Sequence, residues 1–350
     1  MLDEILAQAV AKQASDIFLI AGLPVSYKCS GVIRREDAPP LKPADTAQLA
    51  AQLYERAGRT EEALLNTGDD DFSFAVPHLS RFRVNALRQR GSLGLVIRVV
   101  PFTLPDFRQC HIPDSVMAFA QFTRGLVLIT GAAGSGKSTT LAAMIDHINK
   151  TRSDHIITIE DPIEYVYQGR CSLIHQREVG ADVRSFASAL RSALREDPDV
   201  ILVGEMRDYE TISAAVTAAE TGHLVMSTLH TIGAAQTIDR IIDVCPAGAQ
   251  NQIRGQLAAV LRGVITQQLL PLAVGKGRCA ATEILVGTDA VANLIREGKC
   301  YQIPSILQSG AALGMHSLNA DLARLVSTGR ITREAAERCA TNKSDLKNYL

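Results

Sequence analysis

The chain has 350 residues, of which 47% are apolar, and its formal net charge is −1. No run of eighteen apolar residues occurs, so the sequence predicts a globular protein without a membrane span, long enough for two domains. The near-zero charge and the aromatic content of 5% argue against a nucleic-acid partner. Phosphate backbones need a basic surface, and unpaired bases need aromatic platforms.

The first residues and the cysteines indicate the compartment. Asp3 and Glu4 stand where a secretory signal would carry positive charge, and no long apolar region follows them. The seven cysteines are an odd number, widely scattered and without a C-x-x-C pair, which argues against a disulfide framework and a zinc site. We therefore expect a cytoplasmic protein with reduced thiols.

Residues 1–100 predict a small, strand-rich α+β domain. A helix is expected at 44–57, where apolar side chains form one stripe. Alternating or β-branched residues predict strands at 16–20, 25–33, 72–76, 81–85 and 93–100, with a turn at Ser30-Gly31 inside the second segment. Three prolines in 101–113 predict a linker.

Residues 114–350 predict a second domain of the α/β class. From Gly125 onward, short apolar runs alternate with helical segments, the pattern of a mainly parallel sheet. Beyond about residue 287 the pattern becomes helical. The fold class expected is therefore α/β, with a smaller α+β domain before it.

Residues 131–138 (GAAGSGKS) fit the phosphate-binding pattern G-x-x-x-x-G-K-[ST], between a strand-like run at 126–130 and a helical segment at 139–149. Glycines let consecutive backbone N–H groups converge on a phosphate at a helix N-terminus. Lys137 would neutralise phosphate charge, and the Ser138 hydroxyl would be a ligand of Mg²⁺. The sequence thus predicts ATP and Mg²⁺ binding by Gly131, Gly134, Ser135, Gly136, Lys137, Ser138 and Thr139.

Acids and histidines follow three further strand-like runs. Glu160 and Glu164 come at or after 156–159, Glu205 follows 200–203, and His230 follows 224–228. The carboxyl ends of parallel strands share one edge of a sheet, so these side chains are expected around the phosphate loop. Either Glu164 or Glu160 could orient or deprotonate water, while Glu205 holds the Mg²⁺ shell or the water. His223 is equally compatible with a structural role and with a role in the site.

Three arginines of the first domain are a second source of positive charge. Arg81 and Arg83 are two residues apart in a predicted strand and so point to the same face, and Arg98 lies in another strand. Such a row could reach a nucleotide held by a neighbouring subunit. The alternative is a solvated strand face.

Motifs along nearly the whole chain resemble the secretion and pilus ATPases, and among them the type IV pilus retraction ATPases. These are ASDIFL (14–19), DFSFAVP (71–77), RFRVNA (81–86), GAAGSGKSTT (131–140), ITIEDPIEYV (157–166), DPDVILVGEMRD (197–208) and TGHLVMSTLHT (221–231). The resemblance implies a PAS-like N-terminal domain, a RecA-like ATPase domain, and a homohexamer with ATP bound between subunits.

The resemblance also implies roles for single residues. Glu164 becomes the catalytic glutamate, Glu205 the Walker B acid, and His223 and His230 a histidine box near the γ-phosphate. Arg81, Arg83 and Arg98 become donors to the nucleotide. LIREGK (294–299) and GMHSLNADL (314–322) look like segments typical of retraction ATPases. Assembly and type II secretion ATPases usually carry a further N-terminal domain and a four-cysteine module, which we do not find.

We therefore expect a hexameric motor that hydrolyses ATP to power pilus retraction and twitching motility. It would lie peripherally at the inner membrane and act on a platform protein, and a paralogous retraction ATPase is a further candidate partner. The alternatives are an accessory retraction ATPase, a type II secretion or assembly ATPase, and a nucleotide-sensing module without turnover. A small-molecule kinase is disfavoured because no acceptor-binding lid accompanies the phosphate loop.

Overall fold

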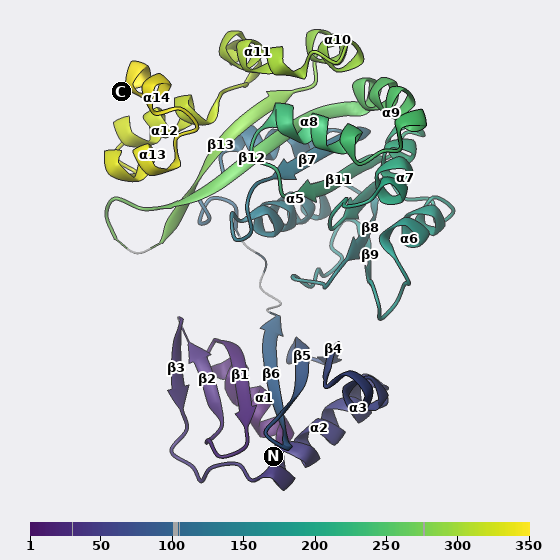
Figure 1. The fold of residues 1–350 in the computed structure, drawn as a ribbon, viewed down its shortest axis with the longest axis vertical. Coiled ribbons are helices and arrows are strands. Elements are labelled where there is room, and N and C mark those ends of the chain that lie inside the picture. Colours follow the sequence, from purple (N-terminus) through teal and green to yellow (C-terminus); the bar gives the residue numbers. More distant parts are fainter. Residues whose placement is uncertain (30, 101–103, 105, 276) are drawn as a thin grey trace. The chain divides into compact units, whose positions relative to one another are not determined.

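The structure, a computed structural model, describes residues 1–350 apart from 30, 101–103, 105 and 276. The chain divides into two compact units, which the ribbon of Figure 1 shows. The first comprises Met1–Thr103 with Glu164–Val166, and the second comprises the remainder. Each unit has its own hydrophobic core.

The first unit is a six-stranded antiparallel sheet in the order β3-β2-β1-β6-β5-β4. Helices α1 and α2 bury their apolar sides in the same core as the strands, as Leu6 and Leu53 illustrate. In β5, Phe82 and Val84 are buried and alternate with less buried residues, as expected for a strand with one covered face. The elements are α1 (Leu2–Ala11), β1 (Ala14–Ile20), β2 (Ser26–Cys29), β3 (Val32–Arg35), α2 (Pro43–Ala57), α3 (Glu62–Thr67), β4 (Asp69–Val76), β5 (Ser80–Gln89) and β6 (Ser92–Val100).

The second unit contains a seven-stranded sheet in the order β13-β12-β7-β11-β10-β8-β9. Six neighbouring strands are parallel, and only the pair of β12 and β13 is antiparallel. The strands are β7 (Gly125–Thr130), β8 (His155–Glu160), β9 (Leu173–Glu178), β10 (Val200–Val203), β11 (Leu224–Leu229), β12 (Leu261–Pro271) and β13 (Arg278–Val286). The carboxyl ends of β7, β11, β10 and β8 therefore share one edge.

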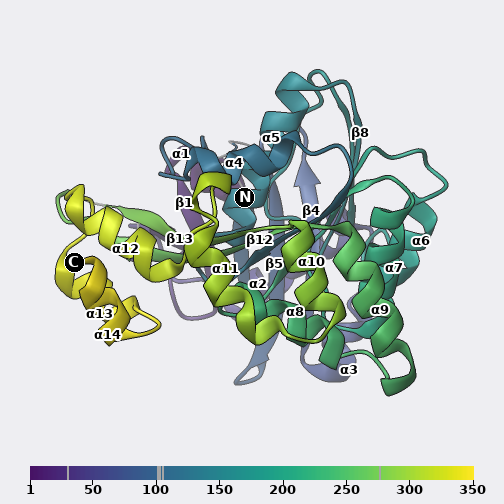
Figure 2. The ribbon, with the colours of Figure 1, turned by 90° about the horizontal axis from the view of Figure 1, so that it is seen from above.

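Helices cover both faces of this sheet, because successive residues of a strand point to opposite sides. Leu126 and Leu128 of β7 face one core, together with helices α6–α10, whereas Val127 and Ile129 face another core with α5. Figure 2 shows the helices on the two sides. They are α4 (Asp114–Met117), η1 (Ala118–Gln121), α5 (Lys137–Thr151), α6 (Phe186–Ala193), α7 (Tyr209–Glu220), α8 (Ala234–Asp243), α9 (Ala247–Val260) and α10 (Asp289–Arg296).

The end of the chain forms a helical subdomain. Leu322 and Ile331 pack with Leu270 and Ala281, so the helices contact the end of β12 and the beginning of β13. Several of these helices begin with a capping side chain; Ser317, for example, accepts the N–H of Ala320. The helices of this subdomain are α12 (Leu318–Ser327), α13 (Arg333–Cys339) and α14 (Lys343–Tyr349). The preceding η2 (Cys300–Gln302) and α11 (Ile303–Ser309) pack in the core that contains α8 and are followed by η3 (Ala311–Leu313).

The structure extends and corrects the expected boundaries. The division between the units falls after residue 103, inside the predicted linker, of which 101–103 and 105 lie outside the described residues. The linker was predicted to reach Pro113, but Phe107 and Ile112 already pack against the core of the second unit, because their apolar side chains are buried there. The predicted turn at Ser30-Gly31 includes Ser30, which is also outside the described residues. Helix α1 and the long β12–β13 pair were not anticipated.

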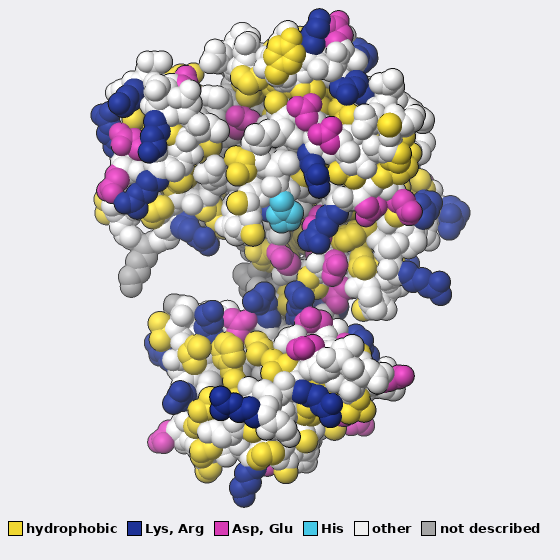
Figure 3. All heavy atoms as spheres, viewed as in Figure 1, with side chains coloured by type: hydrophobic (Ala, Val, Ile, Leu, Met, Phe, Trp, Pro, Cys, Tyr) yellow, Lys and Arg dark blue, Asp and Glu magenta, His cyan; other side chains and the backbone are white. Residues whose placement is uncertain are grey.

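Three further features bear on the sequence predictions. All seven cysteines are free thiols. Among the described residues, no helix has both the length and the apolarity to cross a membrane. Figure 3 shows basic and acidic side chains interspersed over the displayed face of each unit.

Candidate nucleotide-binding site

The predicted phosphate loop connects β7 to α5, and its backbone requires glycine. Gly131 has a φ of 142°, and a Cβ there would lie 2.3 Å from the carbonyl oxygen of Gln267. Gly136 is the N-cap of α5 with a φ of 90°, and a Cβ there would lie 2.7 Å from Nε2 of Gln267. Side chains at these positions would push the loop away from β12. The strand, loop and helix predicted around residues 131–138 are present.

Gln267 of β12 is a positioning residue that the sequence analysis missed. Its Oε1 accepts a hydrogen bond from Thr140 of α5 at 2.8 Å, and its Nε2 donates to the carbonyl of Ser135 at 2.8 Å. The side chain is 2% exposed. One amide group thus ties the loop and the first turn of α5 to the sheet. No motif around Gln267 signals this role, since it depends on β12 pairing with β7.

Lys137 folds back over the loop from the first position of α5. Its Nζ donates to the carbonyl oxygens of Gly131 and Ala132 at 2.9 and 3.0 Å, and lies 3.5 Å from Nδ1 of His230. An ammonium group can only donate, so Nδ1 of His230 is the acceptor in this contact. Positive charge is thereby held beside the backbone N–H groups of the loop.

Glu205 and His230 meet at the carboxyl edge of the sheet. Nε2 of His230 lies 3.6 Å from Oε2 of Glu205, which also accepts a hydrogen bond from Nε of Arg207 at 2.6 Å. Both residues line a cavity of about 330 Å³, together with Arg207 and Arg240. The structure therefore brings together Lys137 at the start of α5, His230 after β11 and Glu205 after β10.

Glu160 is at the same edge but is enclosed by its neighbours. It ends β8, is 8% exposed, and its Oε1 accepts hydrogen bonds from Thr158 at 2.6 Å and from Gln176 at 3.2 Å. Both bonds are made to the same carboxylate oxygen. Glu164 lies four residues further on, in the exposed loop between β8 and β9. Its role as the catalytic base stays a prediction.

His223 lies at the other end of β11 from His230. It precedes the first residue of the strand, and its Nδ1 lies 2.8 Å from the carbonyl oxygen of Ala218. At about 3.3 Å per residue, the strand separates the two histidines by roughly 20 Å. Within one subunit, therefore, the two histidines do not lie near the same phosphate as expected, because their side chains are at opposite ends of β11.

The three arginines of the first unit lie in adjacent strands. Arg83 of β5 is the cross-strand neighbour of Arg98 of β6, which faces Asp16 of β1. Nε of Arg98 donates to Asp16 at 3.2 Å, and Nη2 of Arg83 lies 3.9 Å from the carboxylate of Asp71. Arg81 and Arg83 share the less buried face of β5, as predicted.

The loop has the features that a nucleoside triphosphate requires. The Oγ of Ser135 is buried without a hydrogen-bond partner, which leaves a polar atom available at the floor of the loop. A Cβ on Gly134 would meet nothing within 4 Å, so this part of the loop is open. In the described part of the chain, no cluster of three or more His, Cys, Asp or Glu side chains could hold a metal ion.

Comparisons with known proteins agree with this geometry. The family model described as "Type II/IV secretion system protein" matches residues 1–347. The chain is 48% identical to the type IV pilus ATPase PilT of Pseudomonas aeruginosa, over 96% of each chain. It is 38% identical to PilU, another type IV pilus ATPase of that organism, over 99% of this chain and 90% of PilU.

The chain belongs to the type II/IV secretion system protein family. A crystal structure of the pilus retraction motor PilT with bound ADP matches with a TM-score of 0.89 and 46% identity, covering 99% of both chains. The resemblance to the retraction ATPases is thus confirmed, and so is the expected fold class, a RecA-like ATPase domain with a smaller N-terminal domain. This member of the family carries its phosphate loop, Glu205 and His230 on one sheet edge.

Proposed function

We propose that this chain is the subunit of a homohexameric ATPase that hydrolyses ATP to power type IV pilus retraction and twitching motility. The observation that carries the proposal is the contact of Lys137 and Glu205 with the same histidine, His230, beside the phosphate loop. The high identity to a pilus ATPase over nearly the whole chain supports pilus retraction as the process that this site powers.

The phosphate loop would hold the ATP phosphates. The backbone N–H groups from Gly131 to Thr139 surround the phosphates, and Lys137 exchanges its two loop carbonyls for phosphate oxygens. The hydroxyl of Ser138 and the carboxylate of Glu205 are hard oxygen ligands of the kind that Mg²⁺ prefers. Bound Mg²⁺ would neutralise charge on the β- and γ-phosphates.

Two carboxylates remain for water activation. Glu160 is enclosed by Thr158 and Gln176, which makes it a support for the sheet edge rather than a base. Glu164 is exposed on its loop and is our candidate for the base, whereas Glu205, which lies close to His230, would hold either the Mg²⁺ shell or the water. Because Nδ1 of His230 faces Lys137, its contact with Lys137 would change when a γ-phosphate binds.

Arg81, Arg83 and Arg98 would serve the nucleotide of a neighbouring subunit. Guanidinium groups supplied in trans stabilise charge on a transferring phosphoryl group. The row they form across β5 and β6 lies on one face, because Arg81 and Arg83 alternate along β5 and Arg98 is paired directly with Arg83. If each site is completed by its neighbour in this way, the subunits would form a closed ring.

The partners follow from the proposed task. The ring would act in the cytoplasm, peripherally at the inner membrane, on a platform protein that passes force to the pilus. A paralogous retraction ATPase could act with it. The higher identity to PilT than to PilU, 48% against 38%, favours a main over an accessory retraction ATPase.

ATP turnover measured against protein concentration tests the proposal. We expect activity that rises with self-association, and a fall of about 100-fold or more in the Lys137→Ala and Glu164→Ala variants. Glu210→Ala is the matched control, because Glu210 is an exposed acid on the first turn of α7.

The alternatives predict different results. Binding of ATP without turnover in the unmodified protein would favour the nucleotide-sensing module and contradict the motor. A secretion or assembly ATPase would turn over ATP but fail to restore twitching to cells lacking their retraction ATPase. Restored twitching is therefore the second measurement.

A further inference from the structure

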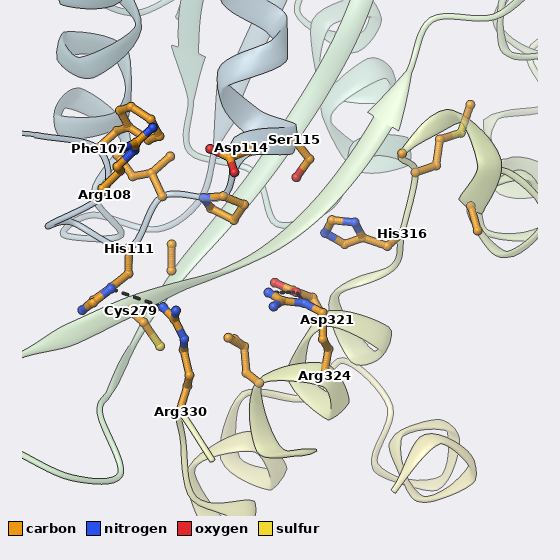
Figure 4. A pocket seen from close by; sticks show the side chains of 17 residues that line it. Phe107, Arg108, His111, Asp114, Ser115, Cys279, His316, Asp321, Arg324 and Arg330 are labelled. Carbon is orange, nitrogen blue, oxygen red and sulfur yellow. Dashed lines mark hydrogen bonds and ion pairs between the residues drawn. The ribbon is translucent and has the colours of Figure 1, made fainter. Parts of the chain in front are cut away.

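A second cavity lies in the ATPase unit, among residues that the ATP site does not use. It has a volume of about 660 Å³ and is walled by residues 107–115, by the start of β13, and by the C-terminal residues 311–330. This volume is within the range of about 300–1,000 Å³ typical of small-molecule sites. Figure 4 shows the side chains that converge on it.

The wall carries more positive than negative charge. Arg108, Arg324 and Arg330 contribute guanidinium groups, while Asp114 and Asp321 contribute carboxylates. Asp321 is already satisfied: its side chain is 2% exposed, pairs with Nη2 of Arg324 at 2.6 Å, and accepts the N–H of Thr282 at 2.8 Å. One arginine and one aspartate thus neutralise each other.

The other two arginines face no acid at ion-pair distance among the residues that the structure describes. Arg108 is exposed and lies over the ring of Phe107, with its guanidinium carbon 5.5 Å from the ring centroid. Nη1 of Arg330 lies 3.2 Å from Nδ1 of His111. In Figure 4, Asp114 lies beside Ser115, across the cavity from Arg330.

The contacts of the two histidines in the wall indicate which of their ring nitrogens donate and which accept. A guanidinium group only donates, so His111 accepts at Nδ1 and presents its N–H at Nε2 as a further donor. Nε2 of His316 lies 2.9 Å from the hydroxyl of Thr282, and burial lowers the pKa of His316. Since the Thr282 hydroxyl donates to Asp321, His316 donates at Nε2. The donors left over near Arg330 are therefore unpaired guanidinium N–H groups and the His111 ring.

We propose that this cavity binds a small organic anion through phosphate or carboxylate oxygens held by Arg330, Arg108 and His111. Guanidinium groups match the geometry of such oxygens, and a flanking imidazole N–H adds a third donor. Apolar side chains, including Ile112, Met315 and Leu325, line the rest of the cavity and suit an uncharged body. The ligand would join the segment that begins the ATPase unit to the C-terminal helices.

Isothermal titration at constant ionic strength, with inorganic pyrophosphate in one arm and citrate in the other, tests the proposal. We expect binding that weakens at least tenfold in the Arg330→Gln variant. Binding should be unchanged in Arg333→Gln, which removes a charge three residues away where Arg333 pairs with Glu337. It should also persist in Lys137→Ala, which removes the ATP site as an explanation. The preferred arm identifies the phosphate or the carboxylate as the recognised group.

Three outcomes would overturn the proposal. These are no heat from either anion at millimolar concentration, equal weakening in the two arginine variants, and loss of binding in Lys137→Ala but not in Arg330→Gln. The melting temperature of each variant is measured without anion. If Arg330→Gln is unfolded, Arg108→Gln takes its place, since Arg108 is exposed and must show the same loss of affinity.

Discussion

Nζ of Lys137 lies 3.5 Å from Nδ1 of His230, although 93 residues separate them in the chain. They meet because β7 and β11 pair in parallel, with Thr130 opposite Leu229. His230 directly follows β11, and the phosphate loop after β7 leads to Lys137, the first residue of α5, at the same end of the sheet. A cation beside a histidine at the phosphate loop gives the site a contact that nucleotide binding must rearrange.

This contact predicts unequal effects of the two histidines. The His230→Ala variant should lose roughly 10- to 100-fold in turnover, because the group between Lys137 and Glu205 is removed, while affinity for ADP changes little. His223→Ala is the matched control at the opposite edge of the sheet. Steady-state turnover and ADP titration compare them. A larger loss in His223→Ala would mean that a neighbouring subunit brings His223 into the site.

Gln267 should be necessary for the shape of the phosphate loop. The Gln267→Ala variant leaves the Ser135 carbonyl and the Thr140 hydroxyl without their buried partner, which costs about 1–3 kcal/mol of folding free energy. Nucleotide affinity should fall as well. Urea unfolding and ADP titration measure the two effects. Gln268→Ala, one residue along β12 and less buried, should leave both unchanged; similar losses in the two variants would refute the bracing role.

Glu283 of β13 predicts a pH dependence of stability. Its carboxylate accepts the N–H groups of Ala234 and Leu318, the first residues of α8 and α12. Burial raises the pKa of Glu283 above its ordinary 4.5, although the two backbone hydrogen bonds lower it in part. The folded state then binds the proton more tightly than the unfolded state, so this contribution to stability falls as pH rises from 4.5 through the raised pKa.

Comparison with the Glu283→Gln variant isolates this effect, because glutamine keeps the shape and does not titrate. The unfolding free energy of the unmodified protein, relative to the variant, should be higher at about pH 5 than at about pH 8. Urea unfolding at both values provides the measurement. A difference that stays constant, or that grows toward alkaline pH, would show that Glu283 is not the titrating group.

The arginine row predicts a defect that appears only in the assembled protein. The Arg81→Ala variant should bind ADP normally but lose turnover by about 10-fold or more, since its guanidinium would act on the neighbour's nucleotide. Arg88→Ala is the matched control, because Arg88 lies on the same strand but on its opposite face. Turnover in mixtures with the Lys137→Ala variant gives the decisive reading. Partial recovery of activity in the mixture would support action in trans. The absence of any recovery would contradict it.

Much of the fold follows from local pattern. The alternation in 81–85 predicts a strand with one buried face, and β5 has that alternation. The strands at 126–130 and 200–203 are wholly buried, as their continuous apolar runs predict. The segment from 107 to 113 escaped prediction because prolines indicate a linker, while the burial of Ile112 depends on a core made from distant residues.

The sequence by itself determined that this chain has a phosphate loop, which acids and histidine follow the parallel strands, and which family it joins. These features depend only on the order of residues along the chain, because the length of an apolar run indicates where a strand ends and a motif is defined by the residues at fixed positions. Only the tertiary structure decided that Gln267 braces the loop, that His223 and His230 lie at opposite edges, and that Arg108, His111 and Arg330 share a cavity. Such relations depend on which strands pair and which helices cover them, and that order is set by packing over the whole unit rather than by any one segment.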